Sequence, residues 1–130
     1  TLFKSAHEVI QVARCDQKLA HCYVEILDAE SALRYAQKSA DVFATAHDQR
    51  RLMYASFELG RAQVLNGDID EGLSTIERVL DAATESDMRD FEFIVTIEKK
   101  IAEILHSLGR SEEASEIERR ISSVTEILED

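Results

Sequence analysis

Apolar residues recur along this chain at steps of three to five positions, the spacing of one face of an α-helix. Two runs show the pattern most clearly: Leu52, Phe57, Leu59, Val64 and Leu65, and Ile94, Ile97, Ile101, Ile104, Leu105 and Leu108. We find no segment that alternates between apolar and polar residues at a period of two, so we expect no β-strand. The pattern predicts an all-α chain.

Short polar turns interrupt this pattern and divide it into six predicted helices. Their approximate ranges are 5–26, 29–46, 49–66, 69–85, 88–108 and 111–128. Because only a few residues connect one helix to the next, consecutive helices must pack antiparallel. The chain is therefore predicted to form three hairpins in a single domain, at about 5–46, 49–85 and 88–128.

Residues suited to helix ends stand at the predicted boundaries. Gly67 and Gly109 fit helix C-termini, where the backbone often needs a left-handed residue. N-cap residues are expected at Asp48, Asp87 and Ser111, the last followed by two acids in the first helical turn. The segment 68–71, Asp-Ile-Asp-Glu, has the form of a capping box.

A pair of one large and one small residue recurs in the first helix of each hairpin. The pairs are Leu19-Ala20, Leu59-Gly60 and Ile101-Ala102, at offsets of 40 and 42 residues. Each is followed, after the next turn, by a small residue in the second helix: Ala32, Gly72 and Ala114. Such a period is typical of proteins built from stacked helical repeats.

Small side chains at these positions would let the two helices of a hairpin approach closely, with Leu19, Leu59 and Ile101 filling the space beside the crossing. A glycine inside a helix costs about 1 kcal/mol relative to alanine. Gly60 and Gly72 therefore indicate a steric requirement. The alternative is that both glycines are tolerated without a packing role.

The recurring pair, the turn and the small residue together resemble the tetratricopeptide repeat (TPR). Leu59-Gly60, the turn at 66–68 and Gly72 match best. The chain departs from the family in having no tryptophan and no proline, and in having Gln63 where an aromatic residue is usual, although Tyr23 fits. The period of 40–42 residues is similar to the long-period class found in LGN/Pins-type scaffolds, kinesin light chains, Tonsoku-like proteins and bacterial peptide-sensing regulators.

This resemblance implies a short right-handed solenoid in which the first helix of each hairpin lines a concave groove. Lys, Arg and Tyr side chains there could hold a peptide with acidic or polar groups. The positions that the resemblance places in the groove are Arg14, Gln17, His21, Tyr54, Phe57, Arg61, Thr96, Lys99, Glu103 and His106. The alternative is that they form ordinary solvated helix faces.

Charge and composition exclude several classes of function. The net charge of −11 argues against direct nucleic-acid binding, which requires a basic surface. The acid is concentrated in the second helix of the hairpins, where it could keep the protein soluble or attract a basic partner. No apolar run approaches the roughly 20 residues of a membrane-spanning helix. Two cysteines, expected to be reduced, suit an intracellular protein in the cytoplasm or nucleus.

The residues that could carry chemistry lack the spacing that chemistry needs. Cys15 and Cys22 are seven positions apart, and no short Cys-x-x-Cys or His-x-x-x-His pattern accompanies them, so buried structural cysteines are expected rather than a metal site. No nucleophile motif or glycine-rich phosphate loop is present. We therefore expect no enzyme, no cofactor and no metal.

The sequence predicts a scaffold or adaptor module that binds a peptide segment of a partner protein. The alternative is a peptide-sensing or dimerisation domain of a transcriptional or signalling regulator.

Two further regions could form contact surfaces. Phe91 or Phe93 would mark a contact surface if its side chain pointed outward. Because the chain opens at Thr1 within a helical pattern, we expect it to be a piece of a longer protein. The last helix carries an apolar stripe, which would meet another repeat, a partner or a second copy, at Ile117, Ile121, Val124, Ile127 and Leu128.

Overall fold

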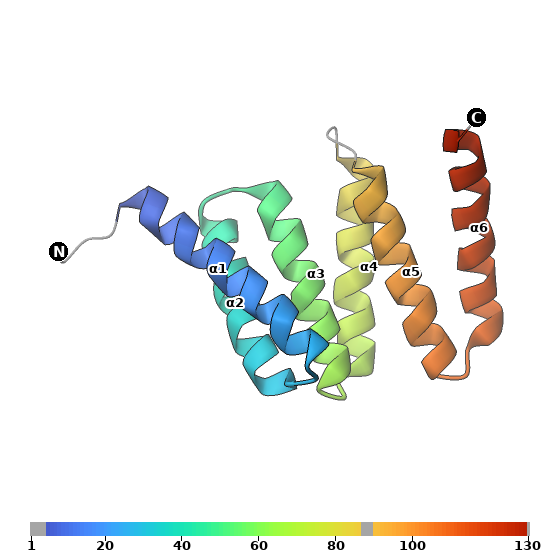
Figure 1. The fold of residues 1–130 in the computed structure, drawn as a ribbon, viewed down its shortest axis with the longest axis horizontal. Coiled ribbons are helices and arrows are strands. Elements are labelled where there is room, and N and C mark those ends of the chain that lie inside the picture. The colour runs from blue at the N-terminus through green and yellow to red at the C-terminus, as the bar shows by residue number, and fades with distance from the viewer. Residues whose placement is uncertain (1–4, 87–89, 130) are drawn as a thin grey trace. The chain divides into compact units, whose positions relative to one another are not determined.

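The structure is a computed structural model that describes residues 5–86 and 90–129, with side chains as far as residue 123. Within this part of the chain there are six helices and no strand, which confirms the all-α prediction (Figure 1). The helices are α1 (Ala6–Glu25), α2 (Ala29–Thr45), α3 (Gln49–Leu65), α4 (Ile69–Glu85), α5 (Phe91–Ser107) and α6 (Ser111–Glu129). The largest difference from the predicted ranges is the start of α5, which begins three residues later than expected.

The chain divides into two compact units, residues 1–79 and 80–130, and the boundary falls inside α4. The first unit contains α1, α2, α3 and the first part of α4. The second contains the end of α4 together with α5 and α6. Each unit has a fully buried apolar side chain of its own, Phe43 in the first and Ile97 in the second.

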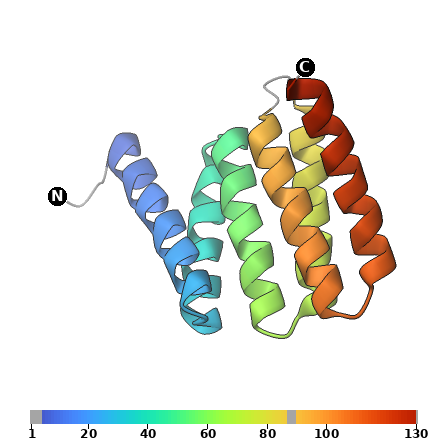
Figure 2. The same ribbon diagram turned by 45° about the vertical axis from the view of Figure 1, so that its right-hand side comes forward.

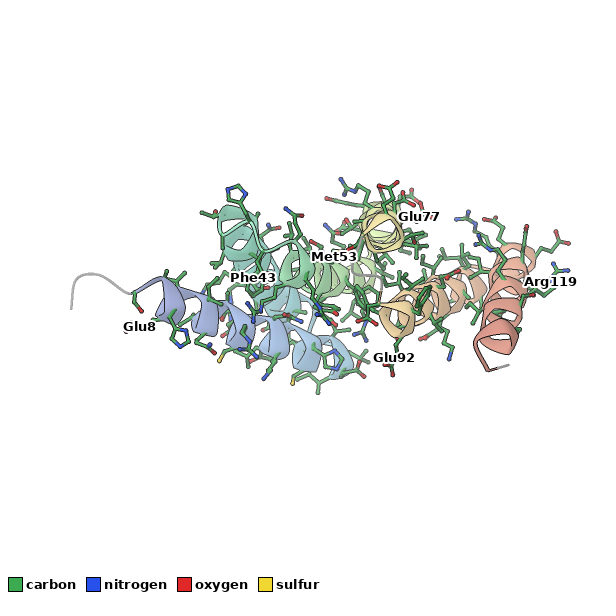
Figure 3. The ribbon with its side chains drawn as sticks, turned by 90° about the horizontal axis from the view of Figure 1, so that it is seen from above. Glu8, Phe43, Met53, Glu77, Glu92 and Arg119 are labelled. Carbon is green, nitrogen blue, oxygen red and sulfur yellow. The ribbon has the colours of Figure 1, made fainter. Side chains whose placement is uncertain are left out.

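The core of the first unit lies where α1, α2 and α3 meet. Both α1 and α3 pack against α2, and α1 also contacts α3. Phe43 of α2, labelled in Figure 3, is completely buried against Ala13 of α1 and Ala55 of α3. Burying such a side chain contributes about 2 kcal/mol, and the alanines around it leave room for the ring. This cluster fixes α1 against α3.

The α3–α4 hairpin has the close approach that the two glycines predict. A Cβ atom added to Gly72 would lie 2.8 Å from the carbonyl oxygen of Gly60 and 2.8 Å from the backbone nitrogen of Val64. A Cβ atom on Gly60 would lie 2.5 Å from Cγ1 of Ile76 and 3.1 Å from the carbonyl oxygen of Gly72. A Cβ atom on Gly72 would also lie 2.5 Å from Cγ2 of Val64, but the two backbone atoms are the obstacles that cannot move aside easily. The steric interpretation is therefore confirmed, and the alternative of two accidental glycines is wrong.

The equivalent small residues of the other hairpins are buried as well. Ala20 and Ala32 have no exposed surface, while Ala102 and Ala114 are at most 3% exposed. The large partners behave differently from one hairpin to another. Ile101 is buried as predicted, but Leu19 is 40% exposed, so the expectation that it fills space beside the crossing is wrong. Leu19 points away from the core because that core is on the side of α1 that carries Ala13 and Ala20.

Four of the helices end in the same turn. In each case a residue with positive φ donates its N–H to the carbonyl three positions back, and the next residue donates to the carbonyl five positions back. This is the Schellman arrangement, which satisfies the last carbonyls of a helix. Gly67 (φ 92°) and Gly109 (φ 76°) confirm the prediction. Leu27 (φ 66°) and His47 (φ 56°) occupy the equivalent positive-φ position of the other two turns, where a side chain with a Cβ atom is sterically strained.

Aspartates cap the N-termini of α2, α3 and α5. The carboxylates of Asp28, Asp48 and Asp90 accept hydrogen bonds from backbone N–H groups of Ser31, Arg51 and Phe93, respectively. The capping role predicted for Asp48 is therefore confirmed. Asp87, which was also predicted, lies outside the described residues, and the cap of α5 is Asp90.

The predicted capping role of Ser111 is wrong, because α6 already begins at that residue. Its hydroxyl instead lies 3.2 Å from Nδ1 of His106. The two acids that follow, Glu112 and Glu113, occupy the first turn of α6 as expected. There they interact favourably with the positive end of the helix dipole.

The second unit is organised around the α5–α6 hairpin, whose two helices run antiparallel (Figures 1 and 2). Ile97 and Leu105 of α5 are almost completely buried, as are Ala114 and Ile121 of α6. Of the apolar stripe predicted on α6, Ile121 is buried and Ile117 is half-buried. The side chains of Val124, Ile127 and Leu128 lie outside the described part of the chain.

Candidate functional site: the α5–α6 groove

A charged cluster joins α1 to α3 in the first unit and involves two predicted site residues, His21 and Arg61. The Arg61 guanidinium donates to Glu58 Oε2 at 3.1 Å and to Glu25 Oε1 at 2.7 Å. The side chains of Arg61 and Glu58 are only 10% and 8% exposed. The Arg61 guanidinium is therefore engaged in two intramolecular ion pairs, and the pair with Glu25 holds the C-terminal part of α1 against α3.

His21 lies at the edge of the same cluster, with a half-exposed side chain. Its Nδ1 atom is 3.1 Å from Glu58 Oε1 and 3.2 Å from Arg61 Nη1. One ring nitrogen cannot donate to the carboxylate and accept from the guanidinium at the same time. The tautomer of the His21 ring therefore decides whether Nδ1 donates to Glu58 or accepts from Arg61.

The other predicted site residues of the first unit are distributed between core and surface. Phe57 is 5% exposed and belongs to the core, with the Arg61 guanidinium carbon 5.8 Å from the centre of its ring. Arg14 is exposed, Gln17 is partly buried, and Tyr54 accepts a hydrogen bond from Nε of Arg50 at 3.2 Å. In the first unit, the predicted set therefore contributes more to stability than to an open binding surface.

The second unit brings three predicted site residues together in a groove between α5 and α6. Lys99, Glu103 and His106 of α5 lie on one side of it, and Glu118 and Ser122 of α6 lie on the other. The groove has a volume of about 480 Å³. Its apolar floor is formed by Ala102 and Ile121, which are 3% and 7% exposed.

Most charged groups around this groove already have partners. His106 Nε2 lies 2.5 Å from Glu118 Oε1 and connects α5 to α6, while Lys100 Nζ donates to Glu103 Oε2 at 3.0 Å. Lys99 is different, because it is exposed and has no ion pair or hydrogen bond with the residues that the structure describes. The groove thus combines an apolar floor with one cation that can accept an anionic partner.

The last predicted site residue, Thr96, is exposed but does not line the groove. Its hydroxyl donates to the Glu92 carbonyl oxygen at 2.9 Å within α5. Glu118 and Ser122 were not predicted, because both come from the second helix of the hairpin. The prediction considered only the first helix of each hairpin as a groove lining.

A second hollow in the same unit, of about 430 Å³, lies between the end of α4, α5 and α6 and includes Phe91, Glu98 and Arg120. Partial burial raises the pKa of Glu98 above its usual value, and the positive charge of Arg120 opposes that shift. Phe91, which was expected to mark a contact surface if it pointed outward, is 46% exposed at the start of α5. The proximity of Glu98 to Arg120 was not predicted, because the two residues come from different helices.

The expectation of buried cysteines is wrong, because Cys15 and Cys22 are both free and exposed on α1. No group of three or more His, Cys, Asp or Glu side chains is placed to hold a metal ion within the described part of the chain. None of the helices in that part is long and apolar enough to cross a bilayer.

Comparison with known proteins gives no match to this chain, whether with protein-family models, with curated proteins or with solved structures. The resemblance to the tetratricopeptide repeat therefore rests on the residue pattern and stays a prediction. The strongest indication of function is the geometry of the groove in the second unit.

Proposed function

We propose that this chain is a protein-interaction module, not an enzyme, and that it binds a peptide segment of a partner in the α5–α6 groove. The observation that supports this proposal most directly is the unpaired Lys99 above the apolar floor of Ala102 and Ile121, within the part of the chain that the structure describes. Peptide sites commonly combine an apolar surface for one side chain with a polar group that fixes orientation.

The charges around the groove favour a peptide that carries an apolar side chain next to a carboxylate. Lys100 neutralises the charge of Glu103, which reduces its repulsion of an acidic peptide, and Nε2 of His106 occupies one carboxylate oxygen of Glu118. Lys99 offers an ammonium group for the peptide carboxylate. Because this contact is exposed, we expect it to contribute to specificity and association rate more than to affinity.

The proposal is tested by selecting peptides from a random library on the immobilised chain and measuring the affinity of the best peptide. Lys99→Glu is expected to weaken binding about tenfold, mainly through slower association, since it replaces a modest attraction by repulsion. Ser122→Phe, which fills the groove without changing its charge, is expected to weaken binding to a similar degree.

The matched control is Arg119→Glu, the same charge reversal on an exposed residue of α6 that does not line the groove (Figure 3). It is expected to leave the affinity within about twofold, because exposed charges outside a contact contribute little. Equal binding by Lys99→Glu, Ser122→Phe and the unmodified chain would show that the peptide binds elsewhere.

A further inference from the structure

Helix α1 exposes a seam of residues that are normally found in protein interiors. The seam consists of Val12, Cys15, Leu19, Cys22 and, at the C-cap, Ile26. Val12, Leu19 and Ile26 are 44%, 40% and 69% exposed, and both thiols are exposed as well. Exposed apolar side chains in one contiguous patch indicate a contact surface.

The spacing of the seam is that of a coiled coil. Its members follow one another at steps of three, four, three and four residues, which places Val12, Leu19 and Ile26 at a positions and the two cysteines at d positions. The residues that α1 buries in its own unit, among them Ala13 and Ala20, lie on a different face of the helix. The seam is therefore a second apolar face of α1, in addition to the one used for folding.

The charges beside the seam are complementary to those of a second α1 that runs in the opposite direction. If Leu19 packs opposite Cys22 of a second copy, the heptad geometry places Lys18 next to Glu25 of that copy, and the two-fold axis repeats the contact. Lys18 is exposed and has no ion pair or hydrogen bond with the described residues. The Glu25 side chain remains 56% exposed although it pairs with Arg61.

A parallel pair lacks this complementarity. It would place Lys18 beside Tyr23 of the other helix instead of beside a carboxylate. From the seam and these charges, we infer that the chain forms a two-fold symmetric dimer in which α1 of one copy pairs antiparallel with α1 of another. This inference does not depend on the peptide groove, which lies in the other unit.

The association is measured by sedimentation equilibrium on the chain under reducing conditions, with a dimer expected at concentrations of about 100 μM. Leu19→Glu is expected to give a monomer, because it places two carboxylates near the axis. His7→Glu, also exposed on α1 but outside the seam, is the control and is expected to remain dimeric. Far-UV circular dichroism verifies that both variants keep their helical content.

A monomeric unmodified chain, or a dimer that Leu19→Glu leaves intact, would overturn the inference. Charge reversal gives an independent test. Lys18→Glu, which would face Glu25 of the other copy, is expected to weaken the dimer about tenfold. A dimer that Lys18→Glu leaves unweakened would contradict the antiparallel register.

Disulfide trapping determines the direction of the helices. In the antiparallel register, a Leu19→Cys thiol lies opposite Cys22 of the second copy, so mild oxidation by copper phenanthroline and oxygen joins two thiols into an intermolecular disulfide. Cys22→Ser in the same chain is expected to abolish the cross-link, and Cys15→Ser to preserve it. A cross-link that survives Cys22→Ser would instead indicate parallel helices joined through residue 19.

Discussion

The two units use equivalent positions of the repeat in opposite ways. Phe57 in α3 and Lys99 in α5 are 42 residues apart, as are Arg61 and Glu103, which is the offset between the second and third repeats. Phe57 is buried and Arg61 is held by two carboxylates, whereas Lys99 and Glu103 are exposed beside an open groove.

The difference arises from the helices that pack against each position within its unit. Helix α1 contacts α3 and brings Glu25 to Arg61, so in the first unit the Arg61 and Glu58 side chains are buried within an ion-pair cluster. In the second unit, α5 pairs with α6 and leaves Lys99 without a partner among the described residues. A charged residue on the first helix of a hairpin is therefore structural in the first unit, as with Arg61, and available for binding in the second, as with Lys99.

The largest expected effect is the loss of the Arg61 cluster. Arg61→Met is predicted to destabilise the first unit by about 3 kcal/mol, because it leaves the buried Glu58 carboxylate without its cation. Lys99→Met, the equivalent change at an exposed and unpaired cation, is predicted to change stability by less than about 0.5 kcal/mol. Urea unfolding can separate the units, since all three tyrosines, Tyr23, Tyr35 and Tyr54, belong to the first and report on it by fluorescence.

A smaller effect is expected from the glycine crossing. Gly72→Ala is predicted to destabilise the first unit by about 2 kcal/mol, because the cost of the backbone clash exceeds the gain in helix propensity. Gly60→Ala should cost less, since Ile76 is a side chain that can move. Ala114 of the α5–α6 hairpin occupies the position equivalent to Gly72. Ala114→Gly should lower the free energy of unfolding of the second unit by about 1 kcal/mol through lost helix propensity alone. Stabilisation by Gly72→Ala would contradict the close approach.

Replacing the two strained turn residues should stabilise the first unit. Leu27→Gly and His47→Gly are each predicted to gain about 1 kcal/mol, because glycine adopts positive φ without steric cost. Leu27 is 74% exposed, so little packing is lost with its side chain. Gly109→Ala is the converse control in the second unit and should destabilise that unit. Thermal unfolding followed by circular dichroism measures all three.

The smallest effect concerns Glu98 in the second unit. Burial raises the pKa of Glu98 above its usual value of 4.5, so the folded state favours the protonated carboxyl. The resulting stability is fully present below the unfolded-state pKa and is lost as the pH rises through the folded-state pKa. Glu98→Gln should therefore be more stable than the unmodified chain at neutral pH, and this difference should disappear as the pH falls below 4.5. A difference independent of pH would contradict the assignment.

The number of helices, their approximate limits and the crossing of α3 and α4 can all be predicted from the sequence. These features depend on local signals: helical periodicity, turns too short for anything but antiparallel packing, and glycines that only a steric requirement explains at Gly60 and Gly72. The left-handed turns at Gly67 and Gly109 were also predictable, whereas those at Leu27 and His47 were not, because packing imposes them on residues that do not favour positive φ.

Which side chains are exposed and free of ion pairs, in contrast, is decided only by how the helices pack. Arg61 and Lys99 are both cations on the first helix of a hairpin, but a partner 36 residues away engages Arg61 and none of the described residues engages Lys99. The cysteines and Leu19 were assigned to the interior by their residue type, yet they lie on an exposed face of α1. Burial and ion pairing depend on contacts between helices that are distant in sequence, and the helical periodicity of a single chain does not contain that information.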